Sequence, residues 1–347
     1  MKTQIKQTIA TTGKFLGQFL TLILCPLWLN ADQVLLKNGS VLFGTLIRAE
    51  SEIVIFETPF AGNLSINRKN IQSMTTDQSV TVLLEDGTVL PECRIVSEKD
   101  QMQIQPAGEE EISLPSADLK MINPAGWMLG KGYEWSGAAR FGLDLERGGT
   151  KKDEWHLEAS STWRNLKNRY IIEGEIENEQ RDGNETENNW SALLKYDRFF
   201  KGNNENYRGI KGFFESDAMA DLDLRMTIGS YLGRRFFENR YFTLQAELGP
   251  VYVEEDFKTT DEDWVGLSWN IQAESGILGH ATKLFLTHDG NQNLDSPDVI
   301  FLNTRIGLSF PLVDNLEASI QIDYEYESTE AEDTLDTSYD WTIGYIW

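Results

Sequence analysis

The stretch from residue 128 to residue 347 alternates apolar and polar side chains over long segments. Trp135, Phe141 and Leu143 fall on one face of an extended segment, and Arg140 and Asp144 fall on the other. Successive side chains of a β-strand point to opposite faces, so this spacing predicts strands rather than helices. The alternation predicts twelve strands, at about 134–146, 153–164, 168–179, 187–198, 206–216, 221–235, 240–254, 263–274, 280–288, 298–310, 315–327 and 337–347.

Strand length and loop length favour a barrel that spans a membrane. Each predicted strand reaches the roughly 9–11 residues that a tilted strand needs to cross a bilayer. Short connections, such as 165–168 and 311–315, alternate with longer acidic ones, such as 180–187 and 288–298, as in barrels with short periplasmic turns and long outer loops. We therefore expect an all-β fold whose main part is an antiparallel transmembrane β-barrel of about twelve strands. The alternative is a soluble sandwich that buries the apolar face between two sheets.

The last predicted strand ends on an aromatic residue. Its apolar face carries Tyr339, Trp341, Ile343, Tyr345 and Trp347, while the opposite face is mostly small or polar. An aromatic outer face and a polar inner face are typical of the closing strand of a transmembrane barrel. We predict that this strand pairs with the first strand, at 134–146, and that its aromatic end is recognised by the barrel assembly machinery.

The polar face of the predicted barrel carries charges of both signs. An ion-paired interior that fills a narrow barrel is the interpretation we favour, and a small pore whose acidic balance favours cations is the alternative. A barrel of about twelve strands lies between filled small barrels and open porins, so its size does not decide between them. The residues on which both interpretations rest are Arg140, Asp144, Glu158, Arg164, Arg169, Glu173, Asp223 and Arg225.

The stretch from residue 32 to residue 125 contains an internal repeat. The segment 34–42 matches the segment 82–90 at a shift of 48 residues, and a constant shift indicates a duplication. We predict repeats at about 32–77 and 78–125, each with about five short strands, resembling a small SH3-like or Sm-like barrel. We call this stretch the N-terminal module.

Each repeat contains the same kind of turn between two short apolar runs. Asn38-Gly39 occupies this place in the first repeat, and Asp86-Gly87 occupies it in the second. Both pairs favour a tight hairpin turn that needs a positive φ.

The chain begins with the pattern of an export signal. Lys2, Lys6 and Lys14 precede an apolar run at 15–29, which predicts a signal peptide at 1–31 with cleavage after Ala31. The formal net charge of −24 argues against nucleic acid as a partner, because phosphate groups would repel it. These features indicate a Gram-negative envelope protein, with the barrel in the outer membrane and the N-terminal module in the periplasm.

Few side chains are suited to catalysis or metal binding. The three histidines are His156, His280 and His288, and an outer-membrane hydrolase built on one of them is the least favoured function. Oxygen-bearing side chains alternate at 289–295 as at the start of a calcium loop, but the glycine and the final glutamate of such a loop are missing. We therefore expect no catalytic residue, no cofactor and no defined metal site.

Several segments resemble the salt-induced outer-membrane protein family, also called domain of unknown function 481. They are Trp127, residues 221–229, residues 248–257 and the hairpin at Pro311-Leu312. The resemblance covers about 130–347 and implies an outer-membrane barrel of about twelve strands, without established catalytic residues. We expect a non-enzymatic structural or stress-related barrel whose module binds a periplasmic protein or a cell-wall component. A narrow channel for ions or small solutes is the alternative.

Overall fold

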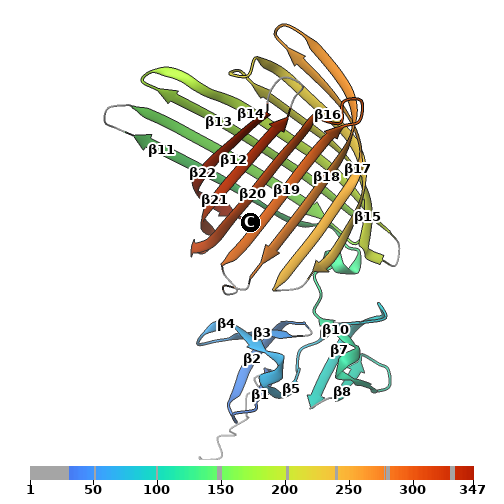
Figure 1. Ribbon diagram of the computed structural model, residues 1–347. Helices are drawn as coiled ribbons and strands as arrows, with labels where there is room; N and C mark the ends of the chain where they lie inside the picture. The colour runs from blue at the N-terminus through green and yellow to red at the C-terminus, as the bar shows by residue number, and fades with distance from the viewer. Residues whose placement is uncertain are drawn as a thin grey trace, which may run out of the picture. The chain divides into compact units, whose positions relative to one another are not determined.

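The computed structural model divides the chain into two compact units, Met1–Pro124 and Ala125–Trp347 (Figure 1). The signal peptide predicted at 1–31 lies, apart from Ala31, outside the described residues. In the part of the chain that the structure describes, no helix is long and apolar enough to cross a membrane. The described residues are 31–50, 52–98, 101–146, 151–200, 203–238, 241–276, 278, 282–328 and 333–347.

The N-terminal module is a ten-stranded antiparallel sheet with two 3₁₀ turns between its strands. The first half contains β1 (Asp32–Leu36), β2 (Val41–Ala49), β3 (Ile53–Thr58), β4 (Gly62–Asn67), η1 (Arg68–Asn70) and β5 (Ile71–Thr75). The second half contains β6 (Val80–Leu84), β7 (Val89–Glu98), β8 (Gln101–Pro106), β9 (Ile112–Pro115), η2 (Ser116–Asp118) and β10 (Leu119–Ile122). A shift of 48 residues places β1 on β6, β3 on β8 and η1 on η2 without a change of bounds.

The last strand of each half also pairs with the other half. β5 pairs with β1 of its own half and with β7 of the other, while β10 pairs with β6 and with β2. The order β1-β5-β7-β6-β10-β2 therefore closes on itself through the pairing of β1 with β2. The halves form one small barrel around a shared core, which includes Val34, Phe56, Ile95 and Ile104. The expectation of one barrel in each repeat is therefore wrong, because pairing of β5 with β7 and of β10 with β2 lets both halves bury their apolar faces together.

The two predicted turns have the expected backbone. Gly39 and Gly87 have φ angles of 88° and 87°, and the Asn38 and Asp86 side chains accept hydrogen bonds from the backbone N–H groups of Ser40 and Thr88 at 3.0 and 2.8 Å. The Thr88 N–H lowers the pKa of Asp86 below its ordinary value. Nothing lies within 4 Å of the place where a Cβ would stand on either glycine, so only backbone strain opposes a substitution.

Replacing Gly87 by alanine should weaken the N-terminal module by about 1 kcal/mol, because alanine is strained at positive φ. The reaction rate of Cys93 can be used to measure this loss of stability, because Cys93 is fully buried and burial raises the pKa of its thiol. We expect Cys93 of the intact variant to react with iodoacetamide about fivefold faster than in the wild type. Gln103→Ala, at an exposed position, should leave the rate unchanged, and an equal rate in Gly87→Ala would contradict the role of this turn.

The second unit begins with η3 (Gly126–Leu129) and forms a closed antiparallel barrel of twelve strands, each paired with its neighbours in sequence and the last with the first. The all-β fold and the strand number predicted from the sequence are confirmed. The strands are β11 (Glu134–Glu146), β12 (Lys152–Arg164), β13 (Asn168–Arg181), β14 (Asn184–Phe200), β15 (Asn203–Asp217), β16 (Leu222–Glu238), β17 (Phe242–Phe257), β18 (Asp261–Ser275), β19 (Lys283–Asn293), β20 (Ile300–Val313), β21 (Leu316–Ser328) and β22 (Asp333–Ile346).

Several strands continue past their predicted ends into the segments expected to be loops. β13 and β14 are joined by a turn at Asp182-Gly183, and β19 runs on to Asn293. The predicted loops at 180–187 and 288–298 are therefore too long. Apolar alternation stops where both faces of a hairpin are polar, but backbone pairing does not depend on apolar side chains and continues.

The two faces of the barrel differ as the alternation predicts. The outer face carries large exposed apolar side chains, including Trp135, Leu143, Trp155 and Ile172. The inner face carries most of the buried charged and polar residues of this unit, such as Asp197. In a water-soluble protein, charged side chains are almost never fully buried unless paired. The barrel has the opposite distribution, with apolar side chains outside and charged side chains inside.

Candidate functional site

A dry polar network lines the inner face at the end of the barrel where the chain enters and leaves. Arg169 on β13 donates from Nε to Asp197 Oδ2 on β14 at 2.6 Å, and the Tyr231 hydroxyl on β16 donates to the other oxygen of Asp197. Lys195 Nζ lies 2.6 Å from Glu247 Oε2, and the Tyr207 hydroxyl donates to Glu247 Oε1 at 2.9 Å. We call these six residues the inner network.

Because the inner network is buried, each of its charged groups depends on its partners within the network. Asp197 and Tyr207 are both fully buried, so the carboxylate of Asp197 has only protein groups to replace its water shell. A buried charge is tolerated when partners satisfy it and is costly when one partner is removed. Phe199 packs beside the network under three guanidinium groups, those of Arg164, Arg169 and Arg235.

Ion pairs in the middle of the barrel join strands that are not neighbours. Arg305 on β20 donates to Asp323 on β21 at 2.5 Å and also to Glu158 on β12 at 2.9 Å. β21, β22 and β11 lie between β20 and β12 in the barrel, so this bond spans part of the lumen. Arg140 likewise joins Glu317 at 2.6 Å and Glu158 at 3.4 Å.

A third group lies toward the end of the barrel away from the termini. Arg225 on β16 contacts Glu255 on β17 at 2.5 Å and Glu327 on β21 at 3.6 Å. Its guanidinium also lies 4.7 Å from the ring centre of Phe301, which stacks on Trp264. Arg225 therefore crosses the lumen at this level.

Water still reaches part of the inner face. Glu173 alternates with Arg169 and Glu175 on β13 and so faces inward, yet it is exposed. The Asp144 side chain, which pairs with Lys152 at 3.4 Å, is 54% exposed. The lumen thus combines dry, ion-paired regions with an accessible region that is mainly acidic.

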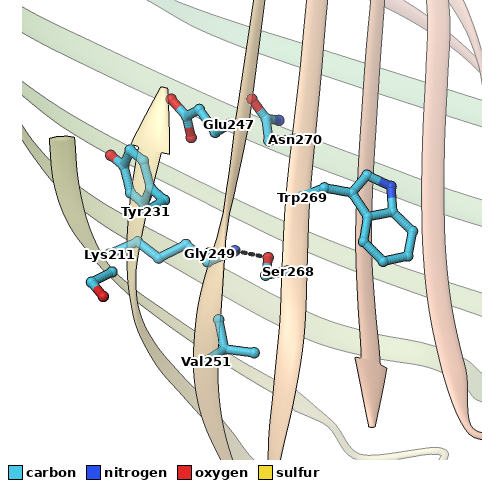
Figure 2. Close-up of a pocket in the computed structure, with 9 residues that line it drawn as sticks. Lys211, Tyr231, Glu247, Gly249, Val251, Ser268, Trp269 and Asn270 are labelled. Carbon is cyan, nitrogen blue, oxygen red and sulfur yellow. Dashed lines mark hydrogen bonds between the residues drawn. The ribbon is translucent and has the colours of Figure 1, made fainter. Parts of the chain in front are cut away.

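A small cavity lies beside the inner network. Figure 2 shows its lining, in which Lys211 Nζ donates to Ser268 Oγ at 2.6 Å near Tyr231 and Glu247. Its volume of about 10 Å³ is about that of one water molecule. Asn270 Oδ1, on the same lining, is buried without a hydrogen-bond partner in the described part of the chain. A single water would satisfy it, and a substrate would not fit.

Two of the charged residues predicted to line the lumen remain, Arg164 and Asp223. Arg164 bonds to Glu238 at 2.9 Å near the turn side of the barrel. Asp223 is exposed at an irregularity between Leu222 and Leu224, so simple alternation does not fix its direction. Four central members of the lumen were missed, because their partners across the lumen are far away in sequence: Tyr207, Tyr231, Glu247 and Arg305.

The histidines and the calcium-like segment do not assemble a catalytic or metal site. Both ring nitrogens of His288 are engaged, Nε2 by Trp269 at 3.1 Å and Nδ1 by Thr304 at 2.8 Å. His156 is buried, with Nε2 3.3 Å from Glu175 but without a hydrogen bond. His280 lies outside the described residues.

Residues 289–293, expected to begin a loop, are part of β19, where their polar side chains alternate between the two faces. Within the described ranges, no group of three or more histidine, cysteine or acidic side chains could hold a metal ion.

A family described as "Protein of unknown function, DUF481" matches residues 139–347. The chain belongs to this family. The match covers the barrel of this DUF481 member and leaves out the N-terminal module. No curated protein matches the chain.

Solved structures with a similar fold include outer-membrane proteins. The NanC porin is 12% identical, with 62% of this chain and 98% of that chain covered and a TM-score of 0.38. The translocator domain of the autotransporter NalP from Neisseria meningitidis is 14% identical, with 62% and 88% covered and a TM-score of 0.36. The channel DcaP of Acinetobacter baumannii is 8% identical, with 91% and 94% covered and a TM-score of 0.33. Likenesses this distant carry no argument about the role of this DUF481 member.

Proposed function

We propose that the chain is a non-enzymatic outer-membrane barrel that anchors the N-terminal module in the periplasm. The observation that carries this proposal is the set of ion pairs across the lumen. Arg305 reaches Glu158, and Arg225 reaches Glu327, on strands that are not neighbours in the barrel. Such bonds hold separate parts of the barrel wall together across the lumen and oppose free passage along the axis. An internally braced barrel suits an anchor better than a transport channel.

The membrane location rests on the outer face of the barrel. In a closed barrel neighbouring strands satisfy each other's backbone groups, as spanning hydrocarbon requires, and the twelve strands pair in this way, with β11 and β22 paired only along residues 137–142 of β11. Aromatic side chains gather near the ends of the strands at the terminal side, where Trp135 stacks on Trp163 and contacts Trp347. Aromatic belts of this kind mark the interface between bilayer and water. Even strand number and the expected signal peptide support a periplasmic position for both ends of the barrel.

The N-terminal module is the part that we propose to engage a partner. Its 3₁₀ turn between the fourth and fifth strand of each half, with the fifth strand paired to the first, supports an SH3-like or Sm-like origin by duplication. Phe43 and Phe60 are exposed on its surface. A periplasmic protein or a cell-wall component is the expected partner, whereas the net charge of −24 disfavours nucleic acid.

A narrow cation channel is the second candidate, and the exposed Glu173 inside the lumen favours it. Bilayer recording separates the two. We expect the refolded full chain to show no steady conductance steps, and the double substitution Arg225→Ala with Arg305→Ala to show them frequently, because it removes both bridges. Arg181→Ala, on a 56% exposed side chain paired with Glu179, should behave as the wild type. Steady, cation-selective steps in the wild type would establish the channel instead.

A further inference from the structure

The barrel is closed by a seam that is much shorter than its other strand pairings. β11 pairs with β12 along its whole length, from Glu134↔Arg164 to Glu146↔Lys152. β22 pairs with β21 along its whole length as well. Between β11 and β22, however, pairing runs only from Ala138↔Ile346 to Gly142↔Thr342, with one further backbone bridge between Gly137 and Trp347.

Beyond Gly142 the two strands separate. Continuing the register would place Leu143 opposite Trp341 and Leu145 opposite Tyr339, but no pairing joins these described residues. Trp341 is 72% exposed and Leu143 is 58% exposed. Figure 1 shows β11, in green, and β22, in dark red, running apart toward the end of the barrel away from the termini. We call these two unpaired edges, residues 143–146 and 333–341, the side opening.

The side opening has an apolar rim and an acidic interior. Leu143, Leu145, Tyr339 and Trp341 lie on the lipid-facing side of the two edges. Asp144 and Asp340 alternate with them and so face the lumen. Unpaired backbone groups are costly in hydrocarbon, so edges at bilayer depth need an occupant that offers polar groups to the backbone and apolar surface to the rim.

The lumen behind the side opening can receive a polar group. The Asp144 side chain is 54% exposed there. His156 lies directly beside the last paired position, since it is the β12 partner of Gly142. Its Nε2 atom is buried 3.3 Å from Glu175 Oε1, without a hydrogen bond in the described part of the chain, and its residue is 4% exposed. The carboxylates of Asp144, Asp340 and Glu177, the β13 partner of His156, outnumber Lys152, the cation that contacts Asp144 at 3.4 Å, and favour a positively charged guest.

We propose that the side opening is a lateral binding site for an amphiphile with an apolar tail and a cationic headgroup. The tail lies in the bilayer against Leu143 and Trp341, and the headgroup enters the lumen beside Asp144 and Asp340. The guest enters and leaves sideways, between the edges that β11 and β22 leave unpaired. This site is separate from the anchoring role of the barrel and does not depend on what the N-terminal module binds.

The first test measures whether the edges are apart. In the full chain in lipid nanodiscs, Ala139→Cys with Tyr345→Cys joins a position that is paired in the seam, and Leu143→Cys with Trp341→Cys spans the side opening. We expect mild oxidation to form the first disulfide at least tenfold faster than the second. Equal rates would show a fully paired seam and would overturn the proposal. Cys93 is fully buried and does not compete, and Cys25, within the expected signal peptide, is replaced by serine in both variants.

The second test measures binding with dodecylamine and, as its matched anionic probe, dodecanoate. We expect saturable dodecylamine binding, above that of empty nanodiscs, with an affinity at least tenfold higher than for dodecanoate. Fastening the 143–341 pair with dibromobimane should weaken binding at least tenfold, while fastening the 139–345 pair should leave it unchanged. Asp144→Asn with Asp340→Asn should remove the preference for the amine.

Three outcomes would overturn the assignment. They are binding that is insensitive to fastening at 143–341, equal affinity for the amine and the carboxylate in the wild type, and efficient cross-linking of Leu145→Cys to a second polypeptide. The last result would assign the edges to strand pairing with another protein.

Discussion

Deletion of Tyr345, Ile346 and Trp347 should abolish assembly of the barrel. The seam depends on these residues, because Tyr345 pairs with Ala139, Ile346 pairs with Ala138, and the backbone of Trp347 exchanges two hydrogen bonds with Gly137 at 3.0 and 3.1 Å. Without them only the pairs from Gly344 to Thr342 remain, too few to hold a closed sheet. We expect the folded fraction to fall at least tenfold.

Heat-dependent gel mobility after refolding into vesicles measures this fraction, and membrane levels in cells provide a second readout. Trp347→Phe is the matched control, since it keeps the backbone bridge to Gly137 and an aromatic ring beside Trp135. It should assemble at close to the wild-type level. Normal membrane levels of the deletion would refute the role of the C-terminal stretch.

Replacing Asp197 by alanine should destabilise the barrel by about 3–5 kcal/mol, the range for breaking a buried ion pair. The substitution leaves the guanidinium of Arg169 and the hydroxyl of Tyr231 without their shared acceptor. Both are buried, so water cannot replace the carboxylate without opening the wall. Chemical denaturation of the protein in vesicles, followed by tryptophan fluorescence, measures the loss.

Asp144→Ala is the control for this substitution. Asp144 also pairs with a cation, Lys152 at 3.4 Å, but its side chain is 54% exposed. An exposed pair contributes roughly 0–1 kcal/mol, so this variant should unfold near the wild-type midpoint. Equal losses in the two variants would mean that burial of the inner network does not set its contribution.

Alternation along single strands was enough to predict the barrel. A strand that faces lipid on one side and the lumen on the other must alternate apolar and polar side chains. This alternation is visible in the sequence of each strand taken alone. The outward positions of Trp135, Phe141 and Trp341 could therefore be read without knowing their neighbours. The repeat at a shift of 48 residues was visible for the same reason, since each copy carries its own turn and apolar runs.

Which residues meet across the lumen could not be read in this way. Arg305 and Glu158 are 147 residues apart, and their encounter depends on the diameter of the barrel and the stagger of its strands. The shared barrel of the N-terminal module could not be predicted either, because it depends on β5 pairing both with β1 of its own half and with β7 of the other. Tyr207 and Tyr231 were missed because aromatic residues are expected on the lipid face.

By itself, the sequence determined the all-β class, the strand number, the lipid-facing surface and the closing strand, because these depend on the residues of one segment at a time. Only the tertiary structure decided that the module is one barrel, that ion pairs bridge the lumen, and that the seam between β11 and β22 is short. Pairing of β11 with β22 depends on where each strand is placed by its other neighbour. That placement is a property of the closed sheet, and no single segment contains it.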